Sequence, residues 1–324
     1  MAFGQTRIGA DYVRNFWRDK RPVRRLPAPI LDPAEFTLTN TPQGLGDSIL
    51  LTHHALACAE AKVPGHAYTP SPCWPVLRDF CPWLPPTHVP RFVSLCDAVA
   101  SWDLGPGHNV QRCRRLFGLP AGPVLPARRR PLFADVVPLG HRVSLHFDAG
   151  PHADWQRQHV HPRARQLYPE NRVVVREFIE AHPELSFIEF GNRPTLRHDR
   201  VEDATGRPLA ETIRLMAECT THLGIVSGPM HLAAALGLRL IVVLNFPHPS
   251  QLCLPALVDT GVVESEWLYP EAMHLHQDAD SPHWPRFGRA SLERAFAGQV
   301  YPYGEPVAEE EFGKQEDRKG RRHE

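Results

Sequence analysis

One stretch, residues 224–244, constrains the fold of this chain more than any other. It holds two short apolar segments, one ending at Val226 and the other covering residues 239–244, with a helical pattern over residues 230–236 between them. Gly237 ends the helical part before the second apolar segment begins. Apolar runs of strand length on both sides of a short helix predict a compact β-α-β unit.

The turn that opens this helix has the composition of an anion-binding site. Pro229 suits a first helical position, because its ring sets φ and its missing N–H would have no partner there. Ser227 and Gly228 just before it are typical of a helix start. The exposed amides and the helix dipole favour an anion such as phosphate, at the strand ends where open α/β sheets bind ligands. Many such units are plain scaffold, so a second feature is needed.

The composition narrows the class of protein. A length of 324 residues exceeds one typical core and favours two domains. No apolar run approaches the roughly 20 residues of a membrane span, and 36 basic residues balance 36 acidic ones, which speaks against a nucleic-acid-binding protein. The seven cysteines form no CxxC pair and the N-terminus has no apolar signal segment, so we expect a cytoplasmic protein.

The N-terminal half repeats the plan of strand, glycine turn and helix. Residues 36–40 alternate as in a strand, a turn follows to residue 47, and a helical pattern covers residues 48–61. The rest of this half predicts strands at 65–69 and 92–99, a loop through the proline-rich residues 70–90 and a helix at 108–118.

From residue 142 onward, apolar strands alternate with amphipathic helices. The expected strands are 143–147, 185–190, 222–226 and 239–244, and the further helices are 172–181, 208–219 and 290–297. This alternation predicts a doubly wound parallel sheet of the Rossmann type.

These patterns predict an α/β protein with two Rossmann-like domains. The division is a basic extension (1–30), an N-terminal domain (31–125), a linker (126–141), a C-terminal domain with the final helix (142–303) and a disordered tail (304–324). The extension mixes arginines with aromatic residues. It either packs on the body or contacts an acidic partner or an anionic membrane surface, which would make the protein peripheral to a membrane.

Two motifs and one helix end carry a resemblance to a known family. Residues 44–51 read Gly-Leu-Gly-Asp-Ser-Ile-Leu-Leu, and residues 227–237 read Ser-Gly-Pro-Met-His-Leu-Ala-Ala-Ala-Leu-Gly. The helix at 108–118 ends in Gly-Leu-Pro. In this order, the features resemble the family 9 glycosyltransferases, whose best-known members are the lipopolysaccharide heptosyltransferases.

The resemblance implies a GT-B fold, with two Rossmann-like domains facing each other across a cleft. The first would bind the acceptor, a glycan, a lipid-linked glycan or another hydroxyl compound. The second would bind a nucleotide-diphosphate sugar, usually ADP-heptose. The implied reaction inverts the anomeric carbon and uses neither a metal ion nor a cofactor beyond the sugar donor as co-substrate. Lipopolysaccharide biosynthesis is the implied setting.

The same resemblance assigns roles to residues. Asp47 would be the catalytic base, because an inverting transfer needs one carboxylate to take the proton of the acceptor hydroxyl. Donor-binding residues would be Ser227, Gly228, Pro229, Met230 and His231, and acceptor-side residues Gly44, Gly46 and Ser48. From the residues alone, Asp47 is also an ordinary residue of a helix start, and His231 a packed or capping histidine.

Two positions depart from the family pattern. The family commonly has Asp before the Ser/Thr-Gly of the second motif, where this chain has Val226. Many members also have a phosphate-binding Lys where this chain has Gln166, and Arg163 and Arg165 are close enough in sequence to replace its charge. The first departure weakens the case for heptose as the sugar.

The loop after residue 147 offers further polar residues. Asp148 and Asp154 are candidate sugar contacts, although turn formation explains them equally well. His152, His159 and His161 lack the spacing of a metal site, so we expect no metal ion.

Three functions remain open at this stage. The leading one is a glycosyltransferase. The second is a GT-B-like protein without transfer activity that binds a nucleotide sugar or a partner protein, which Val226 and Gln166 motivate. The third is another enzyme of the same fold, such as a nucleotide-sugar epimerase.

Overall fold

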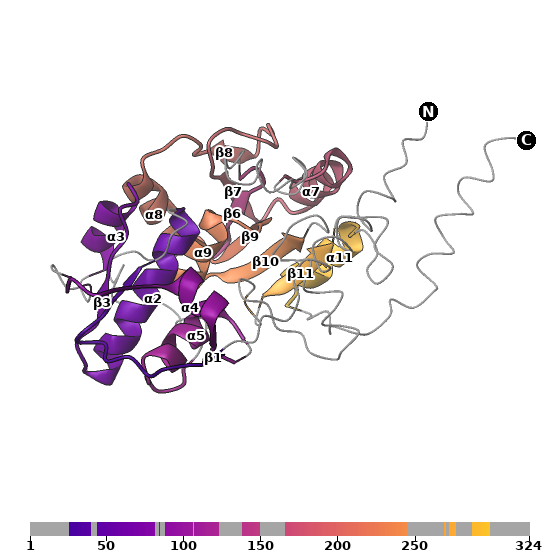
Figure 1. The fold of residues 1–324 in the computed structure, drawn as a ribbon. Helices are drawn as coiled ribbons and strands as arrows, with labels where there is room; N and C mark the ends of the chain where they lie inside the picture. The colour runs from indigo at the N-terminus through magenta and orange to yellow at the C-terminus, as the bar shows by residue number, and fades with distance from the viewer. Residues whose placement is uncertain are drawn as a thin grey trace, which may run out of the picture.

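A computed structural model gives the fold (Figure 1). It describes residues 26–39, 44–81, 84, 88–105, 107–122, 138–149, 166–244, 269, 272–276 and 287–298. In these residues helices accompany strands that pair in parallel, in one large sheet and two small ones. The predicted α/β class is therefore confirmed.

The large sheet belongs to the C-terminal half and has six strands. They are β6 (Arg142–His146), β7 (Ser186–Glu189), β8 (Val201–Asp203), β9 (Thr221–Ile225), β10 (Arg239–Leu244) and β11 (Met273–His276). All neighbours are parallel, in the order β11-β10-β9-β6-β7-β8. This is the strand order of the Rossmann fold, and its direction reverses between β6 and β9. Ligands of open α/β sheets bind beside the carboxyl ends of such a pair.

Helices cover both faces of this sheet, as a doubly wound fold requires. They are α7 (Pro169–Ala181), α8 (Leu209–Ala217), α9 (Gly228–Ala235) and α11 (Arg289–Phe296). Alternate residues of β10 point to opposite faces: Val242 packs in the core with α8 and α9, and Val243 in the core with α7 and α11. β10 is buried from Leu240 to Leu244, which explains the unbroken apolar sequence of these five residues.

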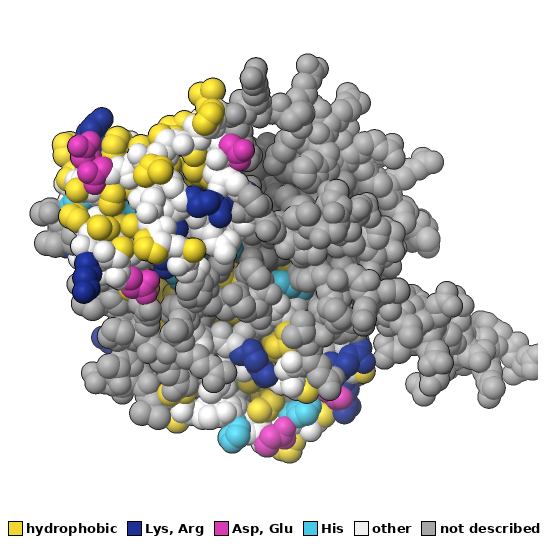
Figure 2. Space-filling model, turned by 90° about the horizontal axis from the view of Figure 1, so that it is seen from below, with side chains coloured by type: hydrophobic (Ala, Val, Ile, Leu, Met, Phe, Trp, Pro, Cys, Tyr) yellow, Lys and Arg dark blue, Asp and Glu magenta, His cyan; other side chains and the backbone are white. Residues whose placement is uncertain are grey.

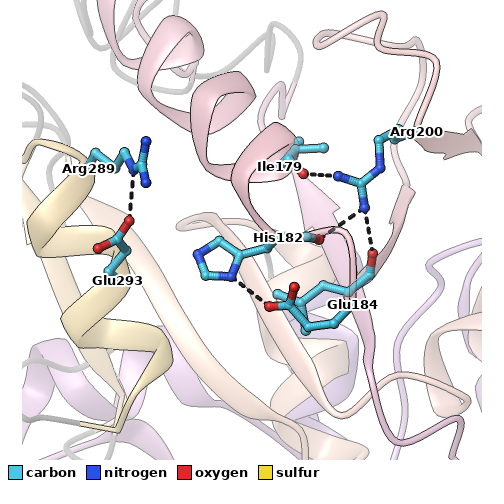
Figure 3. A network of polar contacts seen from close by, with 7 residues as sticks. Ile179, His182, Glu184, Arg200, Arg289 and Glu293 are labelled. Atoms are coloured by element: carbon cyan, nitrogen blue, oxygen red, sulfur yellow. Dashed lines mark hydrogen bonds and ion pairs between the residues drawn. The ribbon is translucent and has the colours of Figure 1, made fainter.

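The end of α7 is tied to the segment before β8 by one arginine (Figure 3). Arg200 donates to the backbone carbonyl oxygens of Ile179, His182 and Leu185. A cation at this end of a helix satisfies carbonyl groups that have no partner within the helix and offsets the helix dipole.

The N-terminal half contains the two small sheets. Strands β2 (Thr37–Thr39), β3 (His66–Ala67) and β4 (Phe92–Ser94) form one in the order β3-β2-β4, and β1 (Leu26–Pro27) pairs with β5 (Trp102–Asp103) in the other. The helices are α2 (Leu45–Ala61), α3 (Trp74–Phe80), α4 (Leu95–Ser101) and α5 (Asn109–Leu116). The predicted helix at 108–118 is confirmed as α5, and Gly118 follows it at a φ of 59°.

Three expectations for this half were wrong in detail. The proline-rich residues 70–90 contain α3, since Pro75 lies in its first turn, where proline is tolerated, and Trp74 and Leu77 are buried. The strand expected at 92–99 ends at Ser94, whose hydroxyl accepts a hydrogen bond from the backbone N–H of Asp97 and starts α4. α2 begins three residues earlier than expected, so the turn glycine Gly46 lies within the helix.

The two halves share one hydrophobic core. It runs from Leu38 and Leu50 in the N-terminal half to Met230 and Val242 in the C-terminal half. The N-terminal half lies on the side of the large sheet covered by α8 and α9, with α2 next to α9 (Figure 1). The predicted linker at 126–141 stays a prediction, because residues 123–137 lie outside the described residues, as do residues 1–25 and 299–324.

Candidate functional site

The starts of α2 and α9 lie directly against each other. A Cβ atom added to Gly46 would lie 2.6 Å from Cδ2 of His231, and one added to Gly228 would lie 2.9 Å from Cβ of Leu45. Only glycine permits approaches this close. The first motif of the N-terminal half and the second motif of the C-terminal half thus form one continuous surface of contact.

Asp47 lies in the first turn of α2 and is half-buried. Its Oδ2 atom lies 3.0 Å from the place that a Cβ atom of Gly44 would occupy, so the carboxylate turns back toward the start of the helix. A negative charge there is favoured by the helix dipole. Ser48 donates its hydroxyl to the carbonyl oxygen of Gly44 at 2.9 Å, so this side chain is engaged within α2.

Ser227 precedes α9 in an extended conformation, with φ −168° and ψ 174°, and its side chain does not cap the helix. Its hydroxyl donates to the carbonyl oxygen of Ile225 at 3.1 Å. Nδ1 of His146, at the end of β6, lies 2.9 Å from the same hydroxyl oxygen and donates to it, because the hydroxyl proton is already used. The two strands at which the sheet order reverses are thereby joined at their carboxyl ends.

His231 is a buried and neutral residue. Its Nδ1 atom lies 2.8 Å from the hydroxyl oxygen of Tyr269, and its ring lies between Tyr269 and Gly46. Burial, reinforced by His53 nearby, lowers the pKa of His231 to about 3. The side chain therefore supplies a hydrogen-bonding group at this contact and no positive charge.

The predicted donor-binding residues divide by exposure. Gly228 and Pro229 are half-buried, whereas Ser227, Met230 and His231 are buried, because α9 is enclosed by the sheet and α2. Val226, where the family has an acid, also packs in the shared core.

The carboxyl ends of β6 and β7 carry two charged residues that form an ion pair. Asp148 accepts a hydrogen bond from Nε of Arg193 at 2.9 Å, and Nη2 of Arg193 lies 2.8 Å from the same carboxylate oxygen. Gly191, at a φ of 130°, makes the turn between β7 and Arg193, and a Cβ atom there would lie 3.1 Å from His146. The sequence interpretation named Asp148 but missed His146, Gly191 and Arg193. A glycine directly after a strand was the available signal.

Arg163, Arg165 and Asp154, together with the histidines at 152, 159 and 161, lie outside the described residues. The residues that flank them are described. Asp148 and Gln166 form an antiparallel bridge, and the backbone N–H of Leu167 donates to the carbonyl oxygen of Phe147 at 3.0 Å. Asp148 and Gln166, described residues before and after the segment with both arginines, therefore pair at the carboxyl end of β6.

The described part of the chain gives little support for metal binding or for catalysis by a cysteine. It contains no group of three histidine, cysteine or carboxylate side chains that could hold a metal ion. Burial raises the pKa of four cysteines to about 12, so they stay protonated thiols: Cys58, Cys81, Cys113 and Cys219.

None of the described helices could span a bilayer. On the face drawn in Figure 2, basic and acidic side chains are interspersed.

The chain is similar in structure to heptosyltransferases. Escherichia coli WaaC with ADP is 13% identical, with 82% of this chain and 99% of that chain covered and a TM-score of 0.49. E. coli ADP-heptose lipopolysaccharide heptosyltransferase II is 14% identical, with 82% and 98% covered and a TM-score of 0.47. TibC, an iron-containing heptosyltransferase crystallised with ADP-D-β-D-heptose, is 14% identical at a TM-score of 0.44. The match covers 66% of this chain and only 59% of the TibC chain.

No protein-family model matches the chain, and no curated protein sequence matches it. The roles of individual residues therefore rest on the two motifs and on the geometry of the site.

Proposed function

We propose that this chain is an inverting glycosyltransferase that takes a sugar from a nucleotide-diphosphate donor. One observation carries the proposal: the helix start that bears Asp47 lies against the helix start formed by Gly228 and Pro229. A helix start that carries a carboxylate therefore lies against a helix start whose composition suits an anion. An inverting transfer needs this pair of groups.

The donor half of the proposal rests on the large sheet. Ser227 follows β9 at the reversal of strand order, and the start of α9 supplies backbone N–H groups and the positive end of a helix dipole. A diphosphate is the natural anion for such a position in a Rossmann fold. Val226 leaves the identity of the sugar open, and ADP-heptose, the compound bound to TibC, is the first to test.

Asp47 is proposed as the base. The acceptor hydroxyl oxygen attacks the anomeric carbon, its proton passes to the Asp47 carboxylate, and the bond from that carbon to the diphosphate oxygen breaks. The nucleoside diphosphate leaves with the bonding electrons, and N–H groups at the start of α9 stabilise its charge. The acceptor is proposed to be a glycan or another hydroxyl compound.

A second function, binding of a nucleotide sugar without transfer, is favoured by a specific observation. The Asp47 carboxylate turns back toward its own helix start, where it already serves to offset the helix dipole. In this alternative the donor turn would remain and Asp47 would have a structural role only.

Substitution of Asp47 by Asn tests the choice. Free nucleotide release is followed with a panel of nucleotide sugars, ADP-heptose included, and candidate acceptors. The rate for Asp47→Asn is expected to fall by about 100-fold or more, because a positioned general base is lost. Asp97→Asn is the matched control, since Asp97 occupies the same place in the first turn of α4.

The outcomes separate the functions. Equal rates for native protein and Asp47→Asn would remove Asp47 as the base. Binding of a nucleotide sugar without any release by the native protein would replace transfer by binding alone.

A further inference from the structure

The pair formed by Asp148 and Arg193 is asymmetric in its exposure to solvent. The Asp148 side chain is 7% exposed, whereas that of Arg193 is 70% exposed. Nε of the guanidinium donates to one oxygen of the buried carboxylate at 2.9 Å, and Nη2 lies 2.8 Å from the same oxygen. One side of the guanidinium is thus held by Asp148, while the Arg193 side chain stays largely exposed to solvent.

This arrangement differs from an ordinary surface ion pair. In the pair between Arg289 and Glu293 on α11, both side chains are about half exposed, 52% and 40%, and they lie one helical turn apart (Figure 3). Exposed pairs of this kind contribute little to stability. Burial of the Asp148 carboxylate costs hydration free energy, and the ion pair with the guanidinium offsets part of that cost. The same ion pair restricts the orientations that the Arg193 side chain can adopt.

The location of Arg193 connects it to the start of α9. Arg193 follows β7 through Gly191, whose Cα faces His146 closely enough that a Cβ atom would lie 3.1 Å from the imidazole. His146 in turn donates to Ser227, the residue before α9. A continuous series of contacts therefore links the guanidinium to the proposed diphosphate site along the carboxyl ends of β7, β6 and β9.

We propose that Arg193 binds a phosphate group of the nucleotide donor, and that Asp148 is the positioning residue that orients it. This inference rests on the proposed function and adds a charged group to its donor site. The outward N–H groups of a guanidinium match two oxygens of a phosphate, and a guanidinium held in advance loses less conformational entropy on binding. The neutral His231 supplies no positive charge for the diphosphate, and Arg193 does.

Calorimetry with ADP, GDP and UDP, and with the corresponding nucleosides, tests the proposal on the full chain. For the diphosphate that binds the native protein, Arg193→Gln should weaken affinity about tenfold or more, because a charge-assisted hydrogen bond is lost. Affinity for the nucleoside should stay unchanged. Arg193→Lys should restore part of the loss, and its binding should fall with added salt as that of the native protein does.

Asp148→Asn reports on the positioning role. It should weaken diphosphate binding less than Arg193→Gln, with the nucleoside again unaffected, whereas a purely structural role would weaken both. Arg289→Gln removes an exposed, ion-paired arginine far along the chain and should change neither affinity.

One result would overturn the role of Arg193 and leave the proposed donor site intact. In that result Arg193→Gln binds the diphosphate as the native protein does, while Gly228→Val loses affinity for it. If the native protein binds none of the three diphosphates, the donor half of the proposed function fails, and the role of Arg193 fails with it.

Discussion

The starts of α2 and α9 are built alike but differ in charge. Each follows a residue in an extended conformation, Gly44 or Ser227, and each relies on a glycine for close packing. The first turn of α2 contains Asp47, whereas the first turn of α9 contains no acidic residue. The start of α2 therefore has a carboxylate of its own side chain beside it, and the start of α9 has none.

This difference supports the proposal that the C-terminal half receives the anionic ligand. The positive end of the α2 dipole is already offset by a carboxylate, so an added phosphate would be repelled there. The start of α9 lacks such a charge, and the Ser227 side chain is held by His146 instead of capping the helix. In the proposed function, the contact between the two starts sets the Asp47 carboxylate beside the site for the leaving diphosphate.

The largest expected effect concerns the contact itself. Gly46→Val should lower the free energy of unfolding by about 3 kcal/mol, because the added atoms collide with the buried His231 ring. Urea unfolding measures the change. Gly140→Val is the control, since nothing lies within 4 Å of a Cβ atom at that turn, and its effect should stay within about 0.5 kcal/mol. Equal losses in the two variants would show that the helix starts do not press together.

The difference in charge can be removed by giving α9 an acidic residue. Pro229→Glu places a carboxylate in the first turn of α9, as in α2, and should weaken nucleoside diphosphate binding about tenfold relative to Pro229→Gln. The two variants share the loss of proline and differ only in charge. Calorimetry at low salt gives the ratio, and equal affinities would mean that the helix dipole has no part in binding.

The pH dependence of stability reports on the neutral state of His231. Its pKa is lowered to about 3 by burial, below its ordinary value of 6.5, so the unfolded chain binds a proton that the folded chain does not. Stability should therefore fall as pH decreases below 6.5, by about 1.4 kcal/mol per pH unit for this residue. His231→Gln should reduce the slope of unfolding free energy against pH by that amount between pH 6 and 4. An unchanged slope would contradict a buried, neutral His231.

Long apolar runs were sufficient to predict the main elements. The strand at 239–244 agrees residue for residue, because a strand buried on both faces must be apolar throughout. Four short strands were missed, two of them, β8 and β11, in the large sheet. β8 is a mostly exposed edge strand of three residues, and β11 has only four residues, so each is too short to show a clear local pattern. Pairing with β7 and β10 makes them strands, and a local pattern does not contain that information.

The candidate site was predictable in its parts and not in its arrangement. The order of the two motifs indicated Asp47 and the turn at 227–229. The burial of His231, the bond between His146 and Ser227, and the orientation of Arg193 by Asp148 join segments that lie far apart in sequence. Arg193 joins Arg163 and Arg165 as a candidate for the charge that Gln166 lacks.

By itself, the sequence determined the α/β class, the glycine turns near the starts of α2 and α9, and the residue types available for the proposed sugar transfer. These follow from local preferences, since periodicity, helix starts and turn residues act within a few positions. Only the tertiary structure decided that the two turns touch, that His231 is enclosed and neutral, and that Arg193 lies at the carboxyl end of β7. Strand order, burial and close glycine contacts depend on segments that meet only when the whole chain has folded.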